Sequence, residues 1–125
     1  MKRLAAFLTL ALLVGACDSG PTDPGDLAGS FRTSGPPMGG VVLEVVGAGI
    51  EKFNGTGGTK VFWAAQPDPT VFRVILVGEG GGDLPFTVTV KDRSKNVPRA
   101  TVVSVVDLDN RPVPVTKDLK VKFSK

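Results

Sequence analysis

The sequence predicts an all-β fold, a single antiparallel β-sandwich of about seven strands. Val, Thr and Phe are dense in residues 27–125, and Gly and Pro interrupt them at short intervals. Apolar and polar residues alternate there with a period of two, and no stretch keeps the spacing of three and four that an amphipathic helix needs. Residues 27–125 are enough for one domain with one core.

The expected strands are short, and turn residues separate them. Alternation is clearest in "LPFTVTVK" and "DLKVKFSK", where every second residue is apolar. Trp63, in line with Val61 and Ala65, is expected in the core. Asn54-Gly55 is expected to form a hairpin turn, because both residues tolerate positive φ. In chain order, the expected strands cover residues 28–33, 41–50, 60–65, 70–78, 84–91, 99–108 and 118–125.

The N-terminal segment has the composition of an export signal. Lys2 and Arg3 precede an apolar run from Leu4 to Gly15 that only Thr9 interrupts. A helix that spans a bilayer needs about 20 apolar residues, so this run is short for a permanent anchor. A positive start, a short apolar region and small residues at its end are typical of a signal that is removed.

Val14, Gly15, Ala16 and Cys17 end this segment, and Cys17 is the single cysteine of the chain. Residues 1–17 resemble the bacterial lipoprotein signal, with Gly15 and Ala16 in the reverse of the commonest order. The resemblance implies a diacylglycerol on the Cys17 sulfur, cleavage after residue 16 and acylation of the new amino group. It also implies a domain in the bacterial cell envelope, lipid-anchored to the inner or outer membrane. Two other interpretations are a leftover thiol after an ordinary signal and an uncleaved anchor.

Residues 17–26 are expected to be the lipidated cysteine and a flexible tether, because 18–26 lack large apolar side chains. Lys2 and Arg3 account for 2 of the 15 basic residues, so 13 basic and 12 acidic residues remain after cleavage. The basic residues concentrate in 91–125. They could contact anionic lipids, acidic glycans or an acidic protein, or Lys120 and Lys122 could line the solvent side of an edge strand. Nucleic acid is not an expected partner of an exported protein.

The residue types exclude several kinds of chemistry. The chain has no His and no Tyr, which rules out Ser–His catalysis and histidine metal sites. Asp107 and Asp109 form the one close carboxylate pair. They are expected to form a turn, and the alternatives are a calcium site with Asn110 or a catalytic pair. We therefore expect a protein without catalytic activity, cofactor or small-molecule substrate.

The C-terminal half runs from "LPFTVTVKD" to "ATVVSVVDLDNRPVP" and a last strand. This order resembles the end of cohesin-type domains, in which a strand leads into an Asp-x-Asp/Asn-Gly-x-Pro turn. Residues 107–112 occupy that turn, with Arg111 in place of the usual glycine. Bacterial immunoglobulin-like modules have similar turns, although the Cys–Trp–Cys pattern of true immunoglobulin domains is absent. The resemblance implies a β-sandwich that binds another protein through one sheet face.

Two expected strands are apolar on both sides, which indicates either loops that cover them or a surface for a partner. In "TVFRVILVG" the faces are Phe72, Val74 and Leu76 against Val71, Ile75 and Val77. In "TVVSVV" they are Val102 and Val106 against Val103 and Val105. The sequence thus predicts a face that docks an envelope or extracellular protein, or less favourably a polysaccharide. A structural lipoprotein without a dedicated ligand and a carboxylate-only hydrolase are the alternatives. The residues predicted for this binding face are Val71, Arg73, Ile75, Val77, Val103 and Val105.

Overall fold

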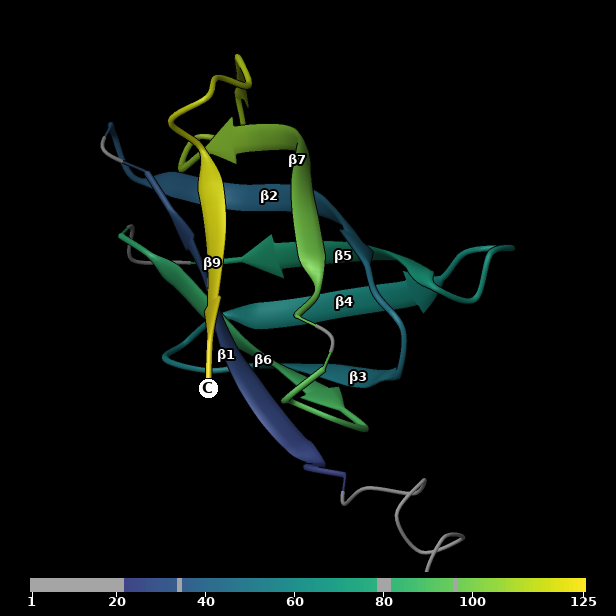
Figure 1. The fold of residues 1–125 in the computed structure, drawn as a ribbon. Helices are drawn as coiled ribbons and strands as arrows, with labels where there is room; N and C mark the ends of the chain where they lie inside the picture. Colours follow the sequence, from purple (N-terminus) through teal and green to yellow (C-terminus); the bar gives the residue numbers. More distant parts are fainter. Residues whose placement is uncertain (1–21, 34, 79–81, 96) are drawn as a thin grey trace, which may run out of the picture.

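The computed structural model describes residues 22–33, 35–78, 82–95 and 97–125. These residues form strands and turns without a helix (Figure 1). The strands are β1 Gly25–Arg32, β2 Met38–Val46, β3 Ile50–Gly55, β4 Lys60–Ala65, β5 Val71–Val77, β6 Leu84–Val90, β7 Arg99–Asp107, β8 Pro112–Val113 and β9 Lys120–Ser124.

The strands form two sheets in which every pairing is antiparallel, so the predicted all-β sandwich is confirmed. The four-stranded sheet has the order β3-β6-β1-β9, and the five-stranded sheet has the order β4-β5-β2-β7-β8. In Figure 1, the antiparallel strands β2, β5 and β4 lie along a similar axis, and β1 and β6 cross them at an angle. Consecutive strands repeatedly change sheet, as in other sandwich folds.

The core lies between the inner faces of the two sheets, and strict alternation builds it. In β6, Leu84, Phe86, Val88 and Val90 are buried as predicted, and the residues between them are half-buried on the outer face. Each such side chain contributes about 1.5–3 kcal/mol when it leaves water. The other fully buried core side chains come from both sheets and are Leu27, Phe31, Val41, Leu43, Val45, Val74 and Leu76.

The expected strand 41–50 is two strands in different sheets. β2 ends at Val46, and β3 begins at Ile50 after a turn in which Gly49 has a φ of 73°. Two backbone bonds fix this turn: the Gly47 amide donates to the Thr70 carbonyl, and the Lys91 amide donates to the Gly49 carbonyl. The apolar run therefore contains a turn between two strands, which the positive φ of Gly49 allows.

Asn54-Gly55 is not the predicted hairpin turn, because both residues belong to β3. The turn lies at residues 56–59, where Gly57 and Gly58 take φ values of 57° and 86° and the Thr59 amide donates to the Thr56 carbonyl. Two consecutive positive φ values are typical of a type I′ turn, which glycine adopts without strain. The turn connects strands of opposite sheets, whereas a hairpin would join neighbours in one sheet.

Three further elements differ from the expectation. β1 begins at Gly25, so Gly25 and Asp26, assigned to the tether, pair with β6. β8 is an additional strand of two residues. Trp63 is 41% exposed and not a core residue, because β4 is an edge strand, although its ring still packs against Phe53 and Phe72.

Candidate functional site

The outer face of the five-stranded sheet carries most of the residues predicted to bind a partner. In β5, Phe72, Val74 and Leu76 point into the core, and the alternate residues point outward. Ile75 is 40% exposed, and Val71, Arg73 and Val77 are half-buried beside it. The structure therefore places these four predicted residues on one outward surface.

Val105 is not on this surface, which corrects the prediction. Val42 pairs with Ser104 and Leu43 pairs with Val102, so Val103 is an extra residue in β7. A bulge of this kind reverses the alternation of the strand beyond it. Val103 is 43% exposed, whereas Val105 is 2% exposed and lies in the core.

The outward residues of neighbouring strands form rows across the sheet. Ile75 pairs with Phe62 of β4 on one side and with Val42 of β2 on the other. Phe62 is 59% exposed, which makes it the most exposed aromatic side chain in the described residues. We call this surface the outer apolar face, and we define it as Val42, Phe62, Ile75, Val77, Val103 and Val106.

Phe62 was not among the predicted binding residues. In "KVFWAA", alternation puts Phe62 and Trp63 on opposite faces of the same strand, and the sequence favours the larger Trp63 as the core residue. Pairing of β4 with β5 puts Phe62 in the same row as Ile75. The sequence alone does not show that Phe62 lies beside Ile75, because this depends on the register between β4 and β5.

A hollow of about 370 Å³ lies at one end of the outer apolar face. Its floor includes Gly40, whose missing side chain leaves the space open: a Cβ there would lie 3.3 Å from the Val106 Cγ2. Ile75, Val77 and Leu108 contribute apolar walls, and Ser104 and Asn110 contribute polar groups. A hollow that is mostly apolar with a few polar groups suits an apolar side chain of a partner.

The charge beside the outer apolar face is modest. The Arg73 Nη2 lies 3.9 Å from the Glu44 Oε2, and both side chains are exposed. An exposed pair of this kind contributes about 0–1 kcal/mol to stability. Arg73 is therefore a charged residue at the border of the outer apolar face, and Glu44 offsets part of its charge.

The β4 edge of this sheet lacks the features that usually discourage strand pairing. β9 has Lys120 and Lys122, β3 has a bulge at Glu51, and β8 is only two residues long and begins with Pro112. In β4 the one charged residue is Lys60 at its start. Within the described residues, β4 pairs only with β5. The apolar surface thus continues to an accessible edge.

Asp107 and its neighbours form the turn between β7 and β8. The Asp107 Oδ1 accepts hydrogen bonds from the amides of Asp109 and Arg111, both at 2.9 Å. Asn110 completes the turn with a φ of 62°, a conformation that asparagine tolerates better than most residues. These contacts favour the turn interpretation over a shared metal or catalytic role. The described residues contain no group of three or more acidic or cysteine side chains placed to hold a metal ion.

Cys17, the predicted lipidation site, lies outside the described residues. In the part of the chain that the structure describes, no helix is long and apolar enough to cross a bilayer. Comparisons with protein families, curated proteins and solved structures found no match to this chain.

Proposed function

We propose that this protein is a membrane-anchored bacterial lipoprotein whose β-sandwich docks a protein of the cell envelope through the outer apolar face. One observation carries the proposal: an apolar surface with a hollow continues to the β4 edge, and no described residue covers it. A contiguous apolar patch on the surface of a monomer usually marks an interaction site. An enzymatic role, a cofactor and a small-molecule substrate are not part of the proposal.

The contacts of the outer apolar face suit a protein better than a polysaccharide. Carbohydrate-binding platforms use several exposed aromatic rings, and among the described residues only Phe62 and Trp63 are aromatic and exposed. The Trp63 ring is held against Phe53, with 5.5 Å between ring centroids, so it does not lie free on the surface. Phe62 and Ile75 instead offer a flat apolar area, which a partner could complete with an apolar side chain in the hollow.

The lipid anchor in the proposal is supported by the sequence of residues 1–17. One acyl chain holds a protein on a membrane only marginally, whereas two or three hold it stably. Such an anchor would keep the outer apolar face near other envelope proteins.

Site-specific photocrosslinking in the source bacterium tests the docking function. A photoreactive phenylalanine analogue at Phe62 should crosslink to one protein, and the same analogue at Thr87 on the outer face of the four-stranded sheet should not. Ile75→Asp should abolish the crosslink from Phe62, because a carboxylate beside Phe62 in the same row would have to be desolvated in the interface. Thr101→Asp is the matched control, since it adds the same charge to the outer side of β7.

The folded state of Ile75→Asp decides how the result is interpreted. Ile75 is outward, so the variant should keep a cooperative urea transition. If Ile75→Asp unfolds the protein, Ile75 belongs to the core and the proposal that this face docks a partner is refuted. If a folded protein crosslinks to nothing from Phe62, a structural role without a dedicated ligand replaces the docking role.

A further inference from the structure

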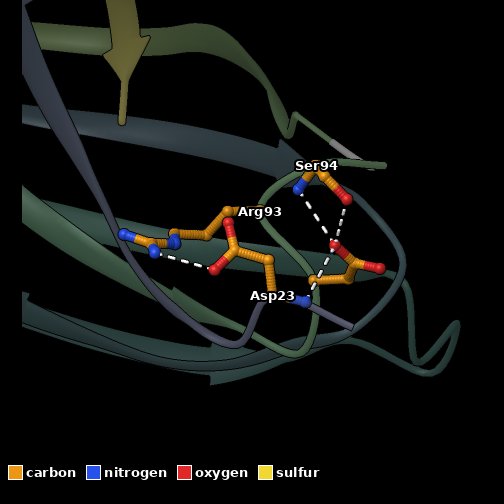
Figure 2. Close-up of polar contacts among 4 residues, drawn as sticks. Asp23, Arg93 and Ser94 are labelled. Carbon is orange, nitrogen blue, oxygen red and sulfur yellow. Dashed lines mark hydrogen bonds and ion pairs between the residues drawn. The ribbon is translucent and has the colours of Figure 1, made fainter. Parts of the chain in front are cut away.

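The chain enters the folded domain at a polar clasp beside the loop between β6 and β7. The Arg93 amide donates to the Asp23 carbonyl at 2.7 Å, and the Arg93 Nη2 donates to the Asp23 Oδ1 at 2.8 Å (Figure 2). The Asp23 amide in turn donates to the Asp92 Oδ1 at 3.4 Å. These three bonds fix the point at which the preceding residues leave the domain.

Asp92 holds the loop in place from the inside. Its Oδ1 also accepts hydrogen bonds from the Ser94 amide and hydroxyl, which lower the pKa of Asp92. The Asp92 side chain is only 10% exposed, and the Asp23 carboxylate is occupied by Arg93, whose pKa it raises. Both acidic side chains of the clasp thus have partners within the protein; the Asp23 side chain is 42% exposed, and the Asp92 Oδ2 is buried without a hydrogen bond.

The solvent side of the same loop is basic and apolar. Lys91, Lys95 and Arg99 are exposed, and Val97 between the last two is 63% exposed. Lys95 keeps only a loose contact of 3.9 Å with Asp92. The three cations and the exposed valine in this loop and at its ends complement an anionic, partly apolar surface such as the headgroup region of a bilayer.

The length of the chain before the clasp determines which end of the domain can reach the membrane. Asp23 is the sixth residue after Cys17, so the Cα atoms of these two residues can be at most about 20 Å apart. β1 has eight residues and is about 25 Å long. The opposite end of the sandwich is therefore farther from the clasp than the tether reaches.

We propose that the β6–β7 loop rests on the bilayer, with Val97 at the headgroup boundary and Lys91, Lys95 and Arg99 beside anionic phosphates. The inference rests on the proposed lipid anchor at Cys17. Each cation near an anionic surface should strengthen the contact about fivefold. The docking face then stands at a fixed orientation to the membrane.

Lysine footprinting tests the contact with internal controls. A chain that begins at Cys17, as the proposed cleavage would leave it, is coupled through the Cys17 thiol to a maleimide phospholipid in vesicles of equal parts phosphatidylglycerol and phosphatidylcholine. Acylation of each lysine is then measured by mass spectrometry, with phosphatidylcholine vesicles for comparison. Acylation of Lys91 and Lys95 should fall several-fold on the anionic vesicles, and acylation of Lys120 and Lys122 should not change. Equal acylation of both pairs on both vesicles would overturn the proposal.

Two variants and one labelling experiment separate the possible causes. Val97→Asp should restore acylation of Lys95, whereas Val115→Asp, at a valine that is 47% exposed in the β8–β9 loop, should not. Asp23→Ala should reduce the difference between Lys95 and Lys120, because it removes the side-chain bond to Arg93, one of the three bonds of the clasp. Metabolic labelling of cells with an alkyne fatty acid, compared with Cys17→Ser, tests the native anchor. If the parent protein shows the footprint but takes up no fatty-acid label, the proposed function is refuted. If it takes up the label but shows no footprint, the membrane contact is refuted.

Discussion

Val103 and Val105 stand two residues apart in β7, and the bulge between Val102 and Ser104 places them on opposite sides of the sheet. The pair Val103→Asp and Val105→Asp tests this geometry, since an uninterrupted strand would give both substitutions the same effect. Val103 is outward and 43% exposed, so its aspartate stays hydrated. The variant should lose about 1 kcal/mol of stability from the apolar area that is buried in the native protein.

Val105→Asp should be far more costly. Removal of the buried valine loses about 2 kcal/mol. Burial in the core raises the pKa of a carboxyl group by up to about 3–5 units, and a rise of about 3 units adds about 4 kcal/mol at pH 7. The total of about 6 kcal/mol is comparable to the whole stability of a domain of this size, about 5–15 kcal/mol.

Urea unfolding followed by the fluorescence of Trp63 measures both values. The penalty in Val105→Asp should also depend on pH: the folded state keeps the proton longer than the unfolded state, so stability falls as pH rises above the unfolded pKa of about 3.9. Similar urea midpoints for the two variants at pH 7 would refute the bulge. A lower midpoint for Val103→Asp than for Val105→Asp would refute it as well.

Two further predictions concern packing and charge. Gly29→Ala should lose about 1–3 kcal/mol, because a Cβ there would lie 2.6 Å from the Phe86 ring, and a urea titration against outward-facing Ala28→Ser checks it. Hydrogen bonds from Thr70 and Ser94 hold the pKa of Asp68 and Asp92 below the ordinary 3.8, so the stability from these groups is present above about pH 4 and lost as pH falls through the lowered values. Between about pH 5 and about pH 2, the melting temperature of Asp92→Asn should fall less than that of the parent protein. Parallel curves of melting temperature against pH would contradict the role of Asp92.

Alternation of side chains predicted the parts of the fold in which one register continues without interruption. β4, β5 and β6 match the expected strands within one residue at each end, and the inward residues of β5 and β6 were assigned correctly. Each of these strands has a clear turn on each side. In such segments burial follows directly from the period of two.

The failures occur where a single residue changes the register. The extra Val103 moved Val105 into the core, and Gly49 divided an apolar run into strands of two different sheets. A valine within a bulge and a valine within a regular strand have the same local sequence, so the difference depends on the partner strand. The candidate site was predicted in part for the same reason: β5 supplied its residues locally, whereas Phe62 and the hollow above Gly40 arise from pairing between strands.

The direction of β2 connects the two proposals. β2 runs from Met38 to Val46, and Val46 pairs with Arg99, at the end of the domain where the clasp lies. The hollow above Gly40 is at the opposite end of β2. If the β6–β7 loop rests on the bilayer, the hollow lies about 20 Å farther from it, where a partner outside the membrane can reach it. A partner that inserts an apolar side chain into the hollow would then approach along the outer apolar face from the side away from the lipid. Crosslinks from the hollow end of the face to a transmembrane segment, in place of a domain outside the bilayer, would contradict this arrangement.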